Sequence, residues 1–366
     1  MPAQPDAVDL APVHALVARV QPSDPRAAAD AIRRQQQLTK PRGSLGELEE
    51  LSVRLCAIAG HCPAPVPGSP AVAVFAGDHG VHAEGVSPWP QEVTAQMVAN
   101  FLSGGAAVNA LAAQAGARVV VVDVGVAAEL DAHPGLLSRK LGPGTANLRL
   151  QSAMSLAAAA EALLVGAEIA AQLVDDGHDL LVTGDMGIAN TTSSAALIAA
   201  FTERAAADVT GRGTGIDDDT WALKVSVIED ALGLHRPEEL SPLEIAAALG
   251  GFEHVAIAGF ILEAAARRVP VVLDGVIAGS AALIAAALAP AAIEFCIAGH
   301  RSAEPGHRIA LDALGLRPVL DLGMRLGEGS GGVLAVHVVQ SAARVLRDMA
   351  TFDAAGVADK EGSASG

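Results

Sequence analysis

Short apolar runs rich in β-branched residues recur along the chain, and most of them end in glycine or aspartate. The runs that we interpret as strands span residues 71–76, 118–122, 179–183, 254–257, 269–273 and 293–297. Alanine-rich segments of helical length, such as 156–173 and 280–288, separate several of them. Uniformly apolar strands that alternate with helices are typical of a parallel sheet buried on both faces. The sequence therefore predicts an α/β fold, with its reactive side chains beyond the carboxyl ends of the strands.

The two ends of the chain have a different pattern. Residues 1–65 have the spacing of amphipathic helices, and the apolar residues of 333–352 are again spaced as in a helix. We predict that these segments pack together as a small helical domain beside a large α/β domain, residues 66–332, which holds the active site. The last residues, 353–366, are small and polar and are predicted to be a disordered tail.

Charge and cysteine content narrow the possible partners and location. A formal charge of −17 argues against nucleic acid as the main partner, because phosphate backbones need a basic surface. The three cysteines, Cys56, Cys62 and Cys296, form no CxxC pair, and the first residues lack a basic secretory signal, so we expect a cytoplasmic protein. Residues 275–293 carry no charge, but their alanine, glycine and proline content favours a buried helix over a membrane span.

The first expected strand is followed by the sequence GDHGVH. Asp78, His79 and His82 have side chains that bind metals, but a strand-end turn also accounts for these residues, and we expect no metal. The next loop, 84–91, contains two prolines and Trp89. This loop is compatible with a pocket for a flat aromatic ligand and equally with a rigid surface loop.

Two glycine-rich turns are candidates for phosphate binding. Residues 184–194 leave a strand and end in hydroxyl side chains that can cap a helix, whose free amides would attract an anion. Residues 211–219 form a second such turn, followed by Lys224. Neither matches a Walker loop or a dinucleotide fingerprint. The alternative is a pair of tight connections whose glycines serve only the backbone.

A third glycine-rich segment, 327–332, contains a single acidic residue, Glu328. Glycine neighbours leave its carboxylate open to a ligand. A lone glutamate in a turn is usually only solvated, but this one lies between the expected sheet and the C-terminal helix, and such junctions often bind ligands.

Taken together and in order, these segments resemble the nicotinate-nucleotide–dimethylbenzimidazole phosphoribosyltransferases, which prepare the lower ligand of cobalamin. The resemblance covers residues 35–350. The matching segments are 40–46, 76–81, 85–87, 184–192, 211–218, 273–275 and 325–331.

The resemblance implies a doubly wound, mostly parallel sheet with a small helical domain, a homodimer, and no cofactor. It implies transfer of a ribose phosphate from nicotinate mononucleotide to 5,6-dimethylbenzimidazole, with Glu328 as the general base. The implied nucleotide-binding residues are Asp185, Gly187, Asn190, Thr191, Thr192, Gly213, Thr214, Gly215 and Lys224. The implied benzimidazole-binding residues are Ser87, Trp89, Gln96 and Leu326. Asp185 stands where the family commonly has glutamate, so a direct ribose contact at that position is in doubt.

Two other functions compete with this interpretation. A dinucleotide-dependent oxidoreductase would carry a glycine fingerprint after the first strand, and residues 77–80 lack it. A non-catalytic relative that binds benzimidazoles or nucleotides would have no need of Glu328. The sequence does not distinguish adenine, benzimidazole and phenolic acceptors.

Overall fold

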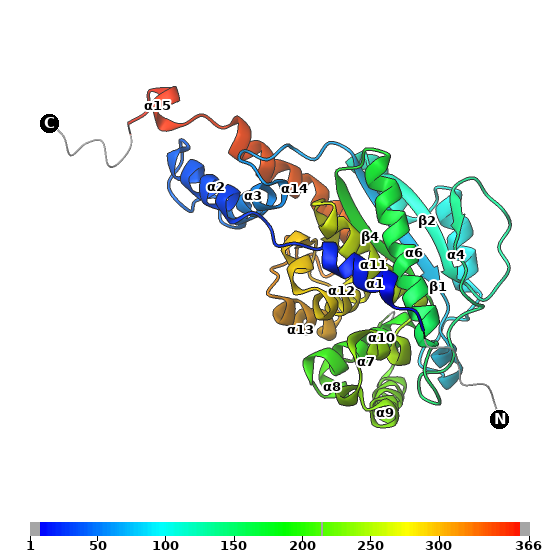
Figure 1. The fold of residues 1–366 in the computed structure, drawn as a ribbon. Coiled ribbons are helices and arrows are strands. Elements are labelled where there is room, and N and C mark those ends of the chain that lie inside the picture. The colour runs from blue at the N-terminus through cyan, green and yellow to red at the C-terminus, as the bar shows by residue number, and fades with distance from the viewer. Residues whose placement is uncertain (1–7, 214, 359–366) are drawn as a thin grey trace.

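A six-stranded parallel sheet forms the centre of the protein. The structure is a computed structural model that describes residues 8–213 and 215–358. In sheet order the strands are β3 (Leu136–Ser138), β2 (Arg118–Gly125), β1 (Pro70–Gly77), β4 (Leu180–Met186), β5 (Val271–Leu273) and β6 (Cys296–Ala298) (Figure 1). Every neighbouring pair is parallel, as the sequence predicted. The chain winds outward from β1 in both directions, so the order reverses between β1 and β4, where open α/β sheets bind ligands.

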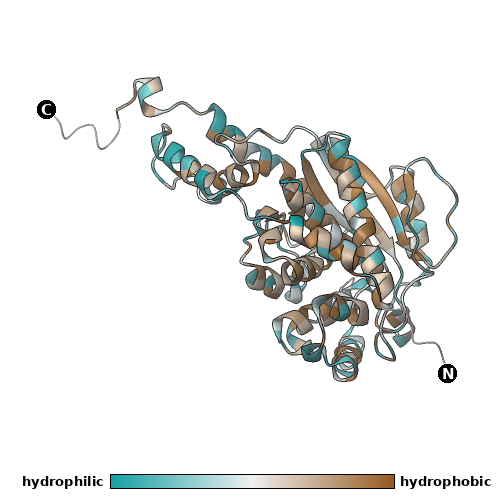
Figure 2. Cartoon of the chain, in the orientation of Figure 1, coloured by the Kyte–Doolittle hydropathy of each residue, from teal (hydrophilic) through white to brown (hydrophobic). Residues whose placement is uncertain are grey.

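Alternate residues of β1 belong to two separate cores. Ala71, Ala73 and Phe75 join one apolar cluster, and the residues between them join the other. Figure 2 shows the strands as predominantly apolar. The first face is covered by α1 (Ala11–Arg19), α6 (Leu156–Asp175), α7 (Asn190–Thr202), α10 (Pro242–Leu249), α11 (Phe252–Ala266) and α12 (Val276–Leu288). The second is covered by α2 (Pro25–Gln37), α3 (Glu47–Ala59), α4 (Val93–Leu102), α5 (Ala107–Ala115) and α14 (Ser330–Asp348).

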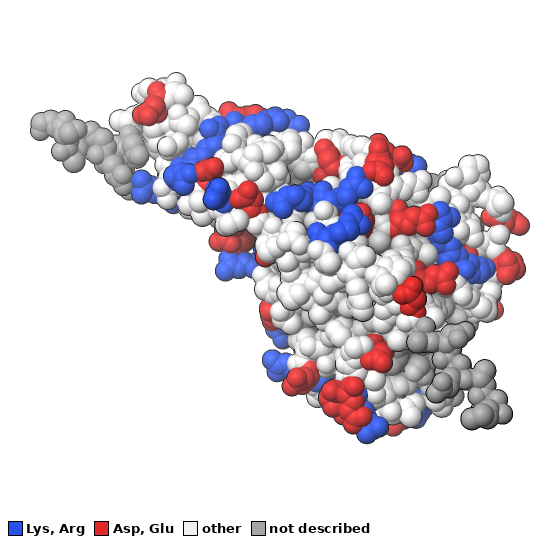
Figure 3. Space-filling view, in the orientation of Figure 1, with Lys and Arg blue, Asp and Glu red and all other residues white. Residues whose placement is uncertain are grey.

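The remaining helices are short or peripheral. They are η1 (Gly80–Glu84), α8 (Ala206–Val209), α9 (Asp218–His235), η2 (Pro237–Glu239), η3 (Pro290–Phe295), α13 (Pro305–Leu314) and α15 (Phe352–Ala355). On the face seen in Figure 3, acidic and basic side chains are intermingled.

Two of the expected strands are corrected by the structure. The run 254–257 is not a strand but lies within α11, where every residue from Phe252 to Ala265 is buried. A helix that is buried on all sides has no polar face, so its apolar run has no helical period to distinguish it from a strand. The run 293–297 begins in η3, and only its last two residues belong to β6.

The two chain ends meet, but only α2 and α3 of the first segment pack near the C-terminal helix α14. Figure 1 shows α2, α3 and α14 together at one end of the molecule, and Arg34 of α2 donates hydrogen bonds to the carbonyls of Leu346 and Arg347. Helix α1 lies instead against α6 and α11, where Arg19 forms a bidentate ion pair with Glu263. The buried residues of α2, α3 and α14 share one core with the sheet. A separate helical domain therefore stays a prediction.

The predicted start of the disordered tail, at residue 353, is too early in the chain. Asp353 lies in the short helix α15, where the Thr351 side chain caps the amide of Ala354. Residues 359–366, the rest of that tail, lie outside the described residues.

Among the described residues, one helix, α6, is long and apolar enough to cross a membrane, by length and composition alone. More than half of its apolar window is buried, and its main contact is with α11. The uncharged segment 275–293 contains α12, whose first ten residues are all buried. Both helices are thus core helices of the sheet.

Glycine allows α6 and α11 to touch backbone to backbone. A methyl group added at Gly259 would lie 1.8 Å from the carbonyl oxygen of Leu163, and one at Gly166 would lie 1.7 Å from that of Ala256. Such contacts explain why a core with only 2% aromatic residues is built from alanine and glycine: the helices sit too close for larger side chains.

Substitution of one of these glycines tests the contact. Gly259→Ala should lower the free energy of unfolding by roughly 1–3 kcal/mol, because the new methyl group must push the two helices apart. Gly233→Ala is the matched control: this helical glycine in α9 has no atom within 4 Å of an added methyl group. It should gain up to about 1 kcal/mol from the better helix propensity of alanine. Equal effects of the two substitutions in urea unfolding would contradict the close packing.

Candidate active site

A cavity of about 390 Å³ opens at the carboxyl ends of β4, β5 and β6. Its walls come from the loop after η1, the turn between β4 and α7, helix α9, the turns after β5 and β6, and the loop before α14. The volume is in the usual range for sites of small molecules. The strand order therefore gathers turns that are far apart in the sequence around one pocket.

Glu328 lies in this cavity on an unusual stretch of backbone. Gly327, Glu328 and Gly329 have φ angles of +83°, +67° and +91°. The left-handed region is natural for the two glycines but costs a non-glycine residue on the order of 1–3 kcal/mol. Asp274 holds the loop in place: its carboxylate accepts hydrogen bonds from the amides of Gly329 (3.2 Å) and Gly332 (2.8 Å).

The Glu328 carboxylate is nearly buried, with 6% of the residue exposed. Its Oε2 accepts a long hydrogen bond, 3.4 Å, from the amide of Val108 in the first turn of α5. Burial raises the pKa of Glu328 above its ordinary value, and the charge of Asp274 adds to the rise. A carboxylate with a raised pKa that faces a cavity is suited to accept a proton.

Asp185, at the end of β4, is a second buried carboxylate in the same cavity. Its Oδ2 accepts a hydrogen bond from the side-chain amide of Asn190, and its buried Oδ1 has no partner among the described residues. Burial, followed by the charges of Asp274, Glu253 and Glu328, raises the pKa of Asp185 well above its ordinary value. These surroundings favour the neutral acid, which can donate a hydrogen bond to a ligand.

The amino end of α7 faces the cavity with unused donors. Among the described residues, the backbone amides of Ala189 and Thr191 have no protein acceptor. The Nζ of Lys224 donates to the Thr191 hydroxyl at 2.8 Å. Burial lowers the pKa of Lys224 to about 8, although the charge of Glu304 acts in the opposite direction. A helix terminus with free amides and a buried ammonium group is a suitable anion site.

The second glycine-rich turn contributes less to this cavity. Gly213 lines it, but its amide already donates to Glu304 Oε1 at 2.8 Å. Thr214 lies outside the described residues. Gly215 and Thr192 do not line the cavity, and Thr192 is fully buried.

The apolar part of the cavity contains most of the residues expected to hold an aromatic base. Ser87, Trp89 and Leu326 line it, and about half of Trp89 and Leu326 remains exposed. Gln96 is exposed and does not line the cavity, because α4 turns Val93 and Met97 toward it instead.

The three possible metal ligands of the GDHGVH segment are not brought together. Asp78 Oδ2 accepts the amide hydrogen of Ala127 at 2.8 Å, and His82 pairs with the Trp89 carbonyl. His79 points to a different cluster, with Glu253 and Ser193. Each side chain thus has its own structural partner.

Sequence reasoning missed one wall of the site. Residues 300–304 follow β6, and His300, Ser302 and Glu304 all line the cavity. Arg212 and Arg325 line it too. The signal for the first group was present, because a polar run directly after a predicted strand marks the same edge of the sheet as the other turns.

Comparisons with known proteins agree with this architecture. A family model described as "Phosphoribosyltransferase" matches residues 20–357. A nicotinate-nucleotide–dimethylbenzimidazole phosphoribosyltransferase of Salinispora tropica is 56% identical, over 94% of this chain and 98% of its own. One of the same name from Chloroflexus aggregans is 57% identical, over 93% of this chain and 96% of its own.

A solved structure is similar over nearly the whole chain. The crystal structure of the enzyme of that name from Thermus thermophilus superposes with a TM-score of 0.88 at 50% identity, covering 92% of this chain and 99% of the other. These matches confirm the resemblance found in the sequence and leave no support for the oxidoreductase alternative. The chain belongs to the nicotinate-nucleotide–dimethylbenzimidazole phosphoribosyltransferase family.

Proposed function

We propose that this protein transfers the phosphoribosyl group of nicotinate mononucleotide to 5,6-dimethylbenzimidazole. The products are α-ribazole 5′-phosphate and nicotinate, and the reaction supplies the lower ligand of cobalamin. The observation that carries the proposal is Glu328, a carboxylate with a raised pKa at the wall of a cavity that also contains an anion site. The names of the relatives supply the substrates.

The chemistry needs one proton acceptor. One benzimidazole nitrogen bonds to C1′ of the ribose while the bond from C1′ to the pyridinium nitrogen breaks, and its electron pair leaves with nicotinate. The positive charge of the pyridinium makes the departing ring a good leaving group. The other benzimidazole nitrogen loses its proton to the Glu328 carboxylate. General base catalysis of this kind contributes typically about 10²–10⁴-fold to the rate.

The two substrates would occupy opposite parts of the cavity. The phosphate lies against the free amides of the first turn of α7, with Lys224 as its counter-charge. The benzimidazole ring lies between Trp89 and Leu326, beside Glu328. Asp185, as a neutral acid between them, donates a hydrogen bond to a ribose oxygen. Holding both rings in line with C1′ supplies the remaining rate enhancement through positioning.

We further propose a cytoplasmic homodimer. Trp89 and Leu326 are large apolar side chains that stay half exposed at the cavity, and a second copy would cover them. Gln96, exposed on α4 nearby, would then face the partner. The free cysteines Cys56, Cys62 and Cys296 are in keeping with a reducing compartment.

The transfer reaction is tested directly by chromatography. Purified protein should release nicotinate from nicotinate mononucleotide only when 5,6-dimethylbenzimidazole is present, with α-ribazole phosphate formed in equal amount. Adenine and a phenol in parallel reactions would measure the acceptor preference. Nicotinate release without any acceptor, or no release with all of them, would refute the proposed reaction.

The base role predicts a specific kinetic loss. Glu328→Gln should lower kcat by roughly 10²–10⁴-fold, because the amide cannot take the proton, while the Kd of nicotinate mononucleotide changes little. Glu203→Gln is the matched control, since Glu203 also has a left-handed backbone, with φ +54°, but is exposed at the end of α7. Near-normal turnover of the Glu328 variant would remove it from the mechanism.

The shifted pKa values of Glu328 and Lys224 predict the pH profile of kcat/KM for the nucleotide. Activity should fall on the acid side below a pKa higher than that of an ordinary glutamate, because Glu328 must be ionised to act as a base. It should fall again near pH 8 as Lys224 loses its proton. Lys224→Arg should move only the alkaline limb, to higher pH, because guanidinium stays charged. An alkaline limb that stays at the same pH would contradict the role of Lys224.

A further inference from the structure

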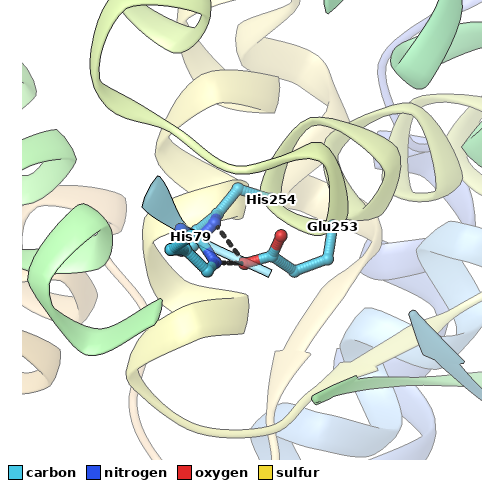
Figure 4. A group of neighbouring side chains, drawn as sticks. All are labelled: His79, Glu253 and His254. Atoms are coloured by element: carbon cyan, nitrogen blue, oxygen red, sulfur yellow. Dashed lines mark hydrogen bonds and ion pairs between the residues drawn. The ribbon is translucent and has the colours of Figure 1, made fainter. Parts of the chain in front are cut away.

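A buried cluster of ionisable side chains lies directly behind the cavity. His79 follows β1, and Glu253 and His254 stand in the first turn of α11 (Figure 4). One carboxylate oxygen, Glu253 Oε1, lies 2.6 Å from His79 Nε2 and 2.8 Å from His254 Nδ1. The three side chains are at most 1% exposed. None of them lines the cavity.

The outer nitrogen of each ring reaches the same helix. His79 Nδ1 lies 3.0 Å from the hydroxyl of Ser193, and His254 Nε2 lies 2.8 Å from that of Ser194. Both serines belong to α7, directly after the turn that carries the free amides. The imidazoles therefore bridge a single carboxylate on α11 to two adjacent hydroxyls on α7.

The spacing favours hydrogen bonds over a shared metal ion. Tetrahedral zinc, with ligands at about 2.0–2.1 Å, keeps its ligand atoms about 3.3 Å apart. The two nitrogen–oxygen distances here are much shorter. Burial by itself would raise the pKa of Glu253, but the two imidazoles outweigh it and hold the pKa of Glu253 below its usual range. A carboxylate oxygen that is hydrogen-bonded to His79 Nε2 and in ion-pair contact with His254 Nδ1 accounts for the geometry.

The cluster also packs against the turn that precedes α7. A methyl group added at Gly187 would meet the His79 ring at 3.4 Å, and one at Gly251 would lie 2.3 Å from His79 Cε1. The ring thus fills the space between the end of β4 and the start of α11. Any rotation of α7 about its own axis would break both serine contacts.

We propose that His79, Glu253, His254, Ser193 and Ser194 are positioning residues that fix the direction of the amides at the start of α7, and so set the affinity for the nucleotide phosphate. The inference rests on the proposed function, in which that turn binds the phosphate. The residues touch neither substrate. They act by preventing the helix from turning, which lowers the entropy that phosphate binding must otherwise remove.

The test is the double variant Ser193→Ala with Ser194→Ala. Its KM and Kd for nicotinate mononucleotide should rise roughly 3- to 10-fold, as expected when buried hydrogen bonds are lost. The KM for 5,6-dimethylbenzimidazole and kcat at saturation should stay within about twofold. The phosphate is bound equally in the ground state and the transition state, so weaker phosphate binding raises the KM of the nucleotide without changing the barrier of the bound complex.

Ser52→Ala is the matched control. This buried serine on α3 accepts a hydrogen bond from the side chain of Gln35 at 2.7 Å, and α3 packs mainly in the apolar cluster on the face of the sheet opposite α7. The variant therefore removes one buried, hydrogen-bonded hydroxyl without touching the turn. It should lower the melting temperature and leave both KM values unchanged.

Three results would overturn the inference. They are a nucleotide KM in the double variant equal to that of Ser52→Ala, a fall in kcat with both KM values unchanged, and stoichiometric zinc in the purified wild-type protein by mass spectrometry. Failure of the proposed function is distinguishable, because wild-type protein would then neither bind nicotinate mononucleotide in calorimetry nor transfer its ribose phosphate.

Discussion

The site depends on one buried carboxylate, Asp274, which follows β5 and accepts the amides of Gly329 and Gly332. These bonds cap the start of α14 and hold three successive residues in left-handed backbone, with Glu328 in the middle. A glutamate would not adopt that conformation in a free turn without cost. The packed sheet therefore supplies the free energy that keeps the Glu328 carboxylate at the cavity wall, and the flanking glycines leave room around it.

Several buried carboxylates gather at this edge of the sheet, among them Asp185, Glu253, Asp274 and Glu328. Burial and repulsion between the carboxylates raise the pKa of Asp185 and Glu328. The imidazoles of His79 and His254 offset the negative charge of Glu253, and the amides at the start of α14 offset that of Asp274. Lys224 and the start of α7 form the electropositive end. This polarity matches the proposed substrate, which has a cationic pyridinium ring at one end and a phosphate at the other, and it offers a local anion site on an acidic protein.

The sequence predicted the features that depend on local pattern. Apolar strands that end in glycine or aspartate indicated the parallel sheet and placed Asp185 at its edge, while the roles of Lys224 and Glu328 followed from the family resemblance. It could not predict α11, because burial on all sides removed its helical period. Nor could it pair His79 with Glu253, which lie 174 residues apart and meet only through the fold. The polar run after β6 was a signal for the position of Glu304, but its contact with the Gly213 amide is tertiary and has no local pattern.

The role of Glu328 as the proton acceptor is tested most directly by a crystal structure with 5,6-dimethylbenzimidazole and ribose 5-phosphate. It should place a Glu328 carboxylate oxygen about 2.6–3.2 Å from the ring nitrogen that faces away from C1′. A ring whose nitrogens both lie beyond the reach of Glu328, while the phosphate occupies the start of α7, would contradict the assignment and leave the reaction without its base.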